Sequence, residues 1–239
     1  MDNLQIGRHI SGQFNEDLER VINNVMHMGG LVEKQLTDAL AAVNQADVAL
    51  AKQVLSNDYQ INAYEVSIDD ECTRIIAKRQ PAAGDLRLIM AVVKTIADLE
   101  RIGDEAFNIA QKTLNLTANE HSKKNYSELS KLGNHVIGLL RDALDAFARL
   151  DVDAALNVAR EAQEADTEYE SFMRTMLTYM MEDPRTISRV LDLMWSARAL
   201  ERITAHTHNL CEYVIYLVEG KDVRHLSVDK MEQLLERDD

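Results

Sequence analysis

The chain has 239 residues, of which 46% are hydrophobic and only 5% aromatic, and it contains two prolines and nine glycines. This composition excludes a disordered chain and favours long helices, because strands and their turns are rich in aromatic, β-branched, glycine and proline residues. Lys and Arg number 26 against 40 Asp and Glu, and the resulting charge of −14 repels nucleic acid and anionic lipid, so neither is expected as a direct partner.

Apolar residues recur every three or four positions along the chain, which is the spacing of amphipathic helices. The pattern breaks at Asn44-Gln45, at Pro81, in the polar stretch Thr117–Lys124 and at Pro184, all of which are typical helix stops or linkers. We therefore predict helices over Leu18–Val43, Asp47–Lys78, Asp85–Leu116, Tyr126–Arg149, Val152–Met181 and Pro184–Val218.

The two halves of the sequence repeat one another. Asp38-Ala39-Leu40 recurs as Asp142-Ala143-Leu144, and Leu99-Glu100-Arg101-Ile102 recurs as Leu200-Glu201-Arg202-Ile203, so the offset falls from 104 to 101. A repeated three-helix unit predicts an all-α fold of two tandem three-helix bundles with pseudo-repeat symmetry. The predicted units are a first bundle over 1–116, a second bundle over 126–220 and a charged C-terminal tail over 221–239.

Carboxylates interrupt the apolar stripe of the third predicted helix, where Glu100 and Asp104 lie one turn apart. Burying unpaired carboxylates is costly, so we expect water, a paired cation or a metal ion beside them. The second helix carries a matching polar row at the rim of the same bundle. The candidate metal ligands are Asp58, Asn62, Glu65, Asp69, Glu100 and Asp104. Such oxygen donors suit a hard divalent or trivalent cation; the alternative is a solvated charged seam neutralised by Arg101 and Arg74.

The second half of the repeat lacks most of this acid. Ala205 replaces the equivalent of Asp104, and two alignments of the other row are open. An offset of 104 gives Ala162, Asp166, Tyr169 and Met173, and an offset of 105 gives Gln163, Thr167, Glu170 and Arg174. Either alignment predicts metal mainly in the first bundle.

Two histidines lie near this depleted row. His208 shares a helix face with Glu201 and Glu212, so a residual mixed site is conceivable there, although a lone partly buried histidine is usually structural. His206 is two residues away on a helix and points to another side, so both histidines cannot bind one ion.

Two strings in the first half resemble signatures of the PhoU family. They are Arg79-Gln80-Pro81-Ala82-Ala83-Gly84-Asp85-Leu86-Arg87, for R-Q-P-x-x-x-D-L-R, and Glu100-Arg101-Ile102-Gly103-Asp104, for E-R-I-G-D. The opening His9–Phe14 and the closing Gly220–His225 are also similar to the family. The resemblance therefore covers nearly the whole chain.

The resemblance implies two three-helix bundles, a homodimer, and metal clusters bound through acidic E/D-x-x-x-D motifs. It also implies two protein partners, the ATPase subunit of a phosphate ABC transporter and a PhoR-type sensor histidine kinase, both restrained when phosphate is plentiful. By position, Glu100 and Asp104 match the first motif, and Asp58, Glu65 and Asp69 match its facing helix. The second motif departs from the family, because it reads Glu201-Arg202-Ile203-Thr204-Ala205.

Other function classes find less support in the sequence. A carboxylate-bridged di-iron enzyme needs Glu-x-x-His pairs, and the sequence contains none; Walker loops, HExxH and serine elbows are also missing. We therefore expect a regulator and not an enzyme, with a diverged metal-binding scaffold, a paralogue without transporter control or a metal-free scaffold as alternatives. Since no apolar run approaches about 20 residues and the start does not look like a signal peptide, we expect a cytoplasmic protein, peripheral to the inner membrane only through protein partners.

Overall fold

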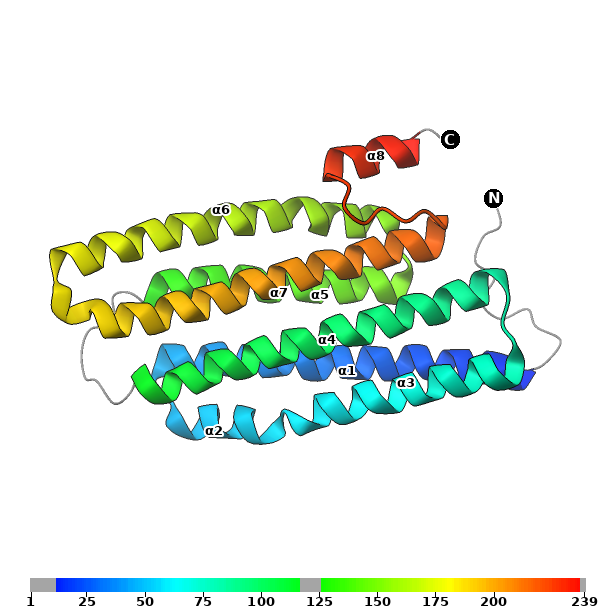
Figure 1. The fold of residues 1–239 in the computed structure, drawn as a ribbon, viewed down its shortest axis with the longest axis horizontal. Coiled ribbons are helices and arrows are strands. Elements are labelled where there is room, and N and C mark those ends of the chain that lie inside the picture. The colour runs from blue at the N-terminus through cyan, green and yellow to red at the C-terminus, as the bar shows by residue number, and fades with distance from the viewer. Residues whose placement is uncertain (1–11, 117–125, 237–239) are drawn as a thin grey trace.

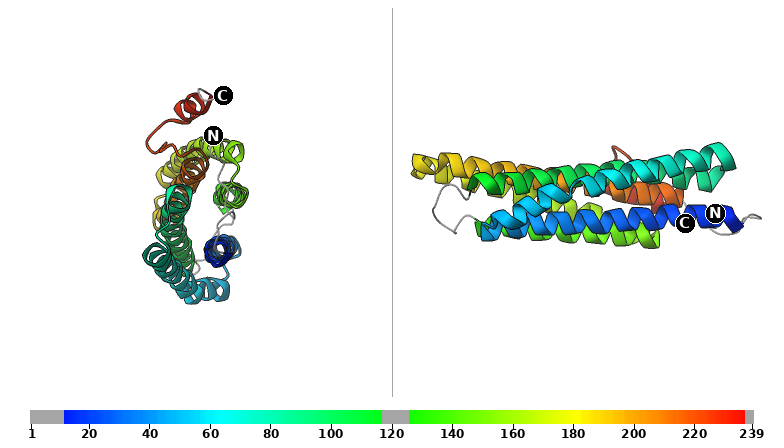
Figure 2. Two further views of the ribbon diagram at one scale, coloured as in Figure 1. Left: turned by 90° about the vertical axis from the view of Figure 1, so that its right-hand side faces the viewer. Right: turned by 90° about the horizontal axis from the view of Figure 1, so that it is seen from below.

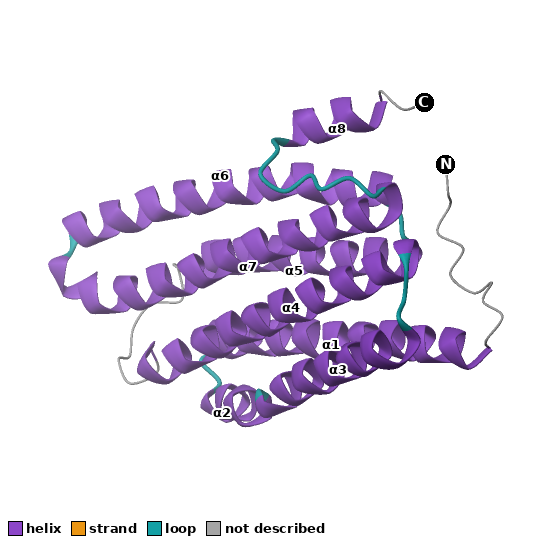
Figure 3. Ribbon diagram, turned by 45° about the vertical axis from the view of Figure 1, so that its right-hand side comes forward, coloured by secondary structure: helices purple, strands orange, loops and turns teal. Residues whose placement is uncertain are grey.

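The computed structural model describes residues 12–116 and 126–236, and the described residues contain helices and no strand (Figures 1 and 3). The predicted all-α fold is confirmed, whereas the predicted linker Thr117–Lys124 lies outside the described residues. The elements are α1 Gly12–Gln45, α2 Val48–Asn57, α3 Tyr59–Arg79, α4 Ala83–Leu116, α5 Tyr126–Arg149, α6 Val152–Glu182, the 3-10 turn η2 Pro184–Thr186, α7 Ile187–Glu219 and α8 Val228–Glu236.

The long helices form two bundles that lie side by side. The first bundle contains α1, α2, α3 and α4, and the second contains α5, α6 and α7. Figure 1 shows α4 and α7 running antiparallel next to each other, and the end view in Figure 2 places α1 and α5 together on the other side. One continuous apolar core extends through both bundles. Because the core does not separate the two bundles, the predicted boundary between them, at residues 116 and 126, stays a prediction from the repeat.

The contact between α1 and α5 is reciprocal. A Cβ added at Gly133 on α5 would lie 2.6 Å from Leu40 Cδ1 on α1, and a Cβ at Gly29 on α1 would lie 2.6 Å from Leu144 Cδ2 on α5. Each leucine thus packs where the opposite helix has no side chain, and its burial contributes about 1.5–3 kcal/mol. The two glycines and the two leucines are each 104 residues apart, so the contact obeys the repeat.

The turns after α1 and α5 also obey the repeat. Ala46 and Leu150 adopt positive φ angles of 54° and 55°. Asp47 then accepts hydrogen bonds from the N–H groups at the start of α2, and Asp151 does the same for α6. An N-cap carboxylate satisfies donors that the first helical turn leaves open. The offset of 104 therefore extends into the second helix of each bundle.

The second predicted helix, Asp47–Lys78, is divided in the structure. Asp58 separates α2 from α3, although its backbone stays near helical values at φ −54° and ψ −35°. The Ile61 N–H bonds to the Asp58 carbonyl three residues before it at 3.0 Å, while the bond from the Asn62 N–H is longer at 3.4 Å. This tighter 3-10 pattern bends the helix axis (Figure 1).

The tail over 221–239, to which the sequence assigned no helix, contains α8. Val223 and Met231 are buried with Ile215 of α7 in a small second core, to which Val152 and Leu156 of α6 add their side chains. Figure 3 shows α8 lying along the outer side of α6. The tail is therefore anchored to the second bundle by apolar packing.

Candidate functional site

The six predicted ligands lie along the line where α3 packs against α4, which we call the acidic seam: Asp58, Asn62, Glu65, Asp69, Glu100 and Asp104. The two helices approach closely here because Gly103 of α4 has no side chain. A Cβ at Gly103 would lie 3.1 Å from Cδ1 of Ile61 on α3. A side chain at this position would force Ile61 to shift.

The carboxylates of the acidic seam influence one another. Partial burial raises the pKa of Glu100, and the negative charges of Asp104, Glu65 and Asp58 raise it further. The pKa of Asp104 is raised by partial burial and by Asp58, and the pKa of Glu65 by partial burial, Asp69 and Asp104. The structure therefore brings the predicted carboxylates of both helices within electrostatic reach, and their charges repel.

One arginine offsets part of this repulsion. Arg101 Nε lies 3.5 Å from Glu100 Oε2, and Arg101 Nη1 lies 3.9 Å from Asp104 Oδ2. Arg101 itself is largely exposed, and exposed ion pairs contribute little, about 0–1 kcal/mol. The prediction that Arg74 also neutralises the acidic seam is wrong, because the Arg74 guanidinium bonds to Glu71 Oε1 at 3.3 Å.

Gln35 of α1 also supports the acidic seam and was missed in the sequence. Its buried Nε2 donates to Asp58 Oδ1 at 2.8 Å and to the Gly103 carbonyl at 3.2 Å. One amide thus links the bend at Asp58 to the close approach at Gly103. The sequence did contain a signal for Gln35. It is a polar residue between Val32 and Ala39 on the apolar face of α1, where an apolar residue is expected.

The second bundle keeps the packing and loses the seam. Buried residues recur at an offset of 104 in the pairs Ala51 and Ala155, Val54 and Val158, Ile61 and Ala165, Ile68 and Phe172, Cys72 and Met176. This agreement excludes the alternative offset of 105. The equivalents of Asp58, Asn62, Glu65 and Asp69 are therefore Ala162, Asp166, Tyr169 and Met173.

Asp166 and His208 are the polar remnant between α6 and α7. Partial burial raises the pKa of Asp166, and the positive form of His208 opposes this shift. Burial lowers the pKa of His208, which Asp166 opposes. His208 Nδ1 lies 3.7 Å from Glu212 Oε1, while Glu201 pairs with Arg198 at 3.0 Å.

His206 belongs to a different cluster, at the contact between α4 and α7. Its Nδ1 lies 2.6 Å from Asp98 Oδ1, and this carboxylate also accepts from Asn209 at 3.2 Å and from the Tyr213 hydroxyl at 2.7 Å. The two histidines therefore point to different clusters, as their spacing on the helix predicted. Asp98 binds α4 to α7, and its equivalent on α7 is Ala199, so this link occurs on one side of the repeat only.

Comparison with known proteins identifies the family. A family model described as PhoU domain matches residues 25–113 and again residues 129–214. The chain is 49% identical over 235 residues to the "Phosphate-specific transport system accessory protein PhoU" of Serratia marcescens, covering 98% of this chain and 96% of that protein. It is 53% identical over 223 residues to the homolog from Pseudomonas putida, covering 93% and 87%. The chain belongs to the PhoU family.

Solved PhoU structures have the same fold. The crystal structure of PhoU from Pseudomonas aeruginosa has a TM-score of 0.85 and 51% identity, covering 87% of this chain and 100% of that chain. The phosphate transport system regulatory protein PhoU from Streptococcus pneumoniae has a TM-score of 0.82 at 27% identity, covering 88% and 99%. Each of the two PhoU matches falls within one bundle, which agrees with the tandem repeat.

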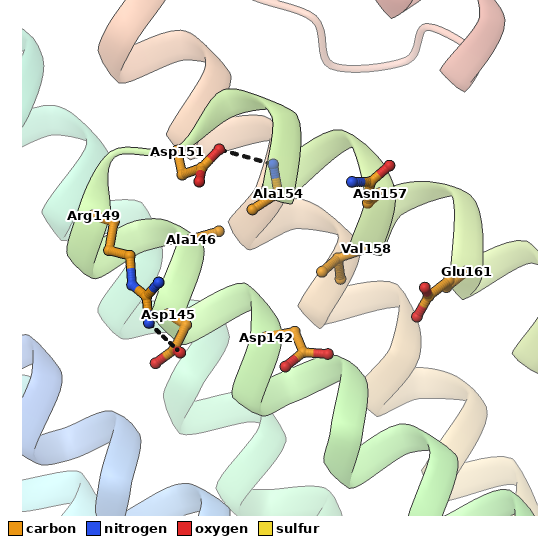
Figure 4. A pocket seen from close by; sticks show the side chains of 9 residues that line it. All are labelled: Asp142, Asp145, Ala146, Arg149, Asp151, Ala154, Asn157, Val158 and Glu161. Carbon is orange, nitrogen blue, oxygen red and sulfur yellow. Dashed lines mark hydrogen bonds and ion pairs between the residues drawn. The ribbon is translucent and has the colours of Figure 1, made fainter.

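A separate hollow of about 250 Å³ opens between α5 and α6 (Figure 4). Its acidic lining residues are Asp142, Asp145, Asp151 and Glu161. Asp145 pairs with Arg149 at 3.2 Å, and Asp151 accepts from the Ala154 N–H at 2.9 Å. Asp151 therefore stabilises the start of α6 as its N-cap, and Asp145 forms an exposed ion pair within α5.

No three His, Cys, Asp or Glu side chains over 12–116 and 126–236 are already arranged to hold a metal ion. The oxygen donors and mutual repulsion of the acidic seam suit a hard cation, because a cation would relieve the repulsion. The metal site at the acidic seam therefore stays a prediction. No helix among the described residues is long and apolar enough to cross a membrane.

Proposed function

We propose that this chain regulates phosphate uptake and phosphate-starvation signalling. In this proposal it acts with the ATPase subunit of a phosphate ABC transporter and with a PhoR-type sensor histidine kinase, and it represses the starvation response when phosphate is plentiful. It works as a cytoplasmic homodimer, reaches the membrane only through protein partners and catalyses no reaction. The observation that supports this proposal is the 49% identity, over 98% of this chain, to relatives named as accessory proteins of phosphate-specific transport.

The electrostatics of the chain are consistent with regulation through protein contacts. A net charge of −14 favours partners with a basic surface and disfavours nucleic acid. The proposal also includes a divalent or trivalent cation at the acidic seam, for which Asp58, Glu65, Asp69, Glu100 and Asp104 supply carboxylates and Asn62 an amide oxygen. The cation would neutralise the repulsion that raises the pKa values of Glu65, Glu100 and Asp104 and so hold α3 against α4.

Deletion of the gene tests the regulatory role. A reporter for phosphate-starvation genes should become active in phosphate-rich medium in the deletion strain, and the intact gene should restore repression. A reporter that stays silent in the deletion strain, in an organism with a second PhoU gene, would favour the alternative of a paralogue or diverged scaffold. The second bundle departs from the family motif, with Ala205 at the position equivalent to Asp104, and this departure is the reason to test that alternative.

A further inference from the structure

A basic hollow lies at the other end of the first bundle from the α1–α2 turn. It has a volume of about 220 Å³ and opens where the start of α1 meets the end of α3. Its lining includes four cationic side chains, one carboxylate and one aliphatic side chain: Arg20, Arg74, Lys78, Arg79, Asp17 and Ile75. We call it the basic pocket. In a chain with 14 more acidic than basic residues, such a local reversal of charge needs an explanation.

Helix stability explains only part of this cluster. Lys78 and Arg79 lie in the last turn of α3, where cations interact favourably with the exposed carbonyl groups of a helix end. Arg74 lies a full turn earlier, and Arg20 belongs to α1. The end of α3 therefore does not account for the two other arginines that line the same hollow.

Internal carboxylates neutralise part of the charge. Asp17 accepts from Arg79 Nη2 at 3.0 Å and from Arg20 Nη2 at 2.7 Å. Glu71, beside the pocket, lies 3.3 Å from Arg74 Nη2 and 3.4 Å from Arg20 Nε. The four lining cations exceed these two carboxylates by two positive charges. Asp17 already occupies the position of a bound anion between two guanidinium groups.

Lys78 contributes to the surplus. It forms no ion pair with the residues that the structure describes, whereas Arg20, Arg74 and Arg79 each do. A lysine ammonium on a flexible stem adds charge without fixed geometry, while guanidinium groups bind oxyanions through two parallel hydrogen bonds. The pocket thus combines directional donors with one mobile cation.

We propose that the basic pocket binds a dianionic phosphoryl group, as free orthophosphate or as a small phosphate monoester. Planar guanidinium groups match the oxygen atoms of such a group, and its two negative charges equal the surplus. The volume lies below the roughly 300–1,000 Å³ of pockets that hold drug-sized ligands, so the ligand is small. This inference depends on the pocket alone and does not require the proposed regulatory function.

The second bundle provides an internal contrast. At the repeat offset of 104, the positions of Arg74, Lys78 and Arg79 hold Thr178, Glu182 and Asp183. All three cations are lost, and two are replaced by acids. The phosphoryl site is therefore a property of the first bundle only.

Calorimetric titration of the full chain with orthophosphate, at constant ionic strength, tests the proposal. We expect saturable binding with a Kd on the order of 1 mM, and a weakening of about tenfold or more in Arg74→Gln and in Lys78→Gln because each loses a charge-assisted contact. Arg174→Gln is the control, since it removes an exposed arginine of α6 that pairs with Glu170 and does not line the pocket. It should bind as the unchanged protein does.

Asp17→Asn separates a ligand site from a structural ion-pair network. The substitution releases Arg20 and Arg79 from a competing internal anion, so orthophosphate should bind several-fold more tightly. A network that only joins α1 to α3 would show loss of thermal stability without any gain in binding. No saturable binding in the unchanged chain, or equal loss in Arg174→Gln, would overturn the proposal.

A parallel titration identifies the source of the phosphoryl group. Orthophosphate and adenosine monophosphate are compared, with sulfate as a second dianion and chloride as the salt control. Tighter binding of the monoester, lost in Lys78→Gln, supports the site and assigns it to an ester; tighter binding of orthophosphate supports the site and assigns it to the free ion. Equal weak heats for all four anions would show screening alone and would contradict the proposal.

Discussion

The two bundles share a core and differ in what lines the junction of their second and third long helices. Buried positions of α3 and α6 agree at an offset of 104, from Ile61 and Ala165 to Cys72 and Met176. The acidic seam beside the first of these cores has an alanine, a tyrosine and a methionine in the second bundle in place of Asp58, Glu65 and Asp69. The periodicity of the buried residues therefore specifies the bundle, and the acidic seam is not needed for the fold.

The two bundles also use different residues where their second and third long helices pack together. The first bundle places Gly103 against Ile61, and the equivalent positions in the second bundle hold Thr204 and Ala165, both buried. Gly103 on α4 lies against the larger Ile61 on α3, whereas at the equivalent positions the larger residue is Thr204 on α7 and the smaller is Ala165 on α6. Exchanges that conserve volume are those that protein cores tolerate best.

The largest expected effect comes from breaking this size relation. Ile61→Ala should lower the free energy of unfolding by about 2–5 kcal/mol, because it leaves a cavity. Gly103→Thr should lower it by about 1–3 kcal/mol through overpacking against Ile61. The double variant copies the second bundle and should lose less than the sum, measured by urea denaturation as a double-mutant cycle. Strict additivity would show that the two positions do not compensate.

A second prediction concerns cation binding at the two junctions. A hard divalent or trivalent cation at a concentration of 100 times its Kd should stabilise the chain by about 2.7 kcal/mol. Glu100→Gln with Asp104→Asn should abolish this gain, because it removes two ligands from the acidic seam. Glu201→Gln with His208→Asn, the matched change in the second bundle, should leave the gain intact. Thermal unfolding with and without the metal measures both, and equal loss in the two variants would falsify the asymmetry.

The smallest expected effect concerns the metal-free protein and pH. Glu100 and Asp104 have raised pKa values in the folded state, so their favourable contribution is present below about pH 4 and is lost as the pH rises through the folded pKa values. Glu100→Gln with Asp104→Asn should therefore raise Tm by about 2–4 °C at pH 7 in chelator. The gain should shrink toward pH 4, and a gain that is constant with pH would point to a cause other than charge repulsion.

Much of the fold could be predicted from the sequence because helix periodicity and proline are local signals. The turns at Pro81 and Pro184 and the repeat followed from these signals. The bend at Asp58 did not, because a change from a four-residue to a three-residue hydrogen bond leaves the side-chain pattern intact. The helix α8 was not predicted because its segment is rich in charged residues, although Val228 and Met231 are spaced as on one face of a helix.

The candidate site could be predicted in part, for a related reason. Spacing on two helices was enough to bring Glu65 and Glu100 together, because both helices were correctly paired. Contributions from a third helix were not visible, so Gln35 was missed. The partner of Arg74 was misassigned because a long side chain reaches several neighbours, and only the folded chain shows that it bonds to Glu71.

The reciprocal contact between α1 and α5, in which Leu40 meets Gly133 and Leu144 meets Gly29, has the form of an isologous interface. Subunits related by a two-fold axis meet in this way, with the same patch used twice. The chain is thus built like a dimer of one bundle whose two copies have been joined covalently. In a true dimer every substitution appears on both sides of the axis. Joining the copies removes that restriction, so one bundle can keep its carboxylates and basic pocket while the other exchanges them for packing.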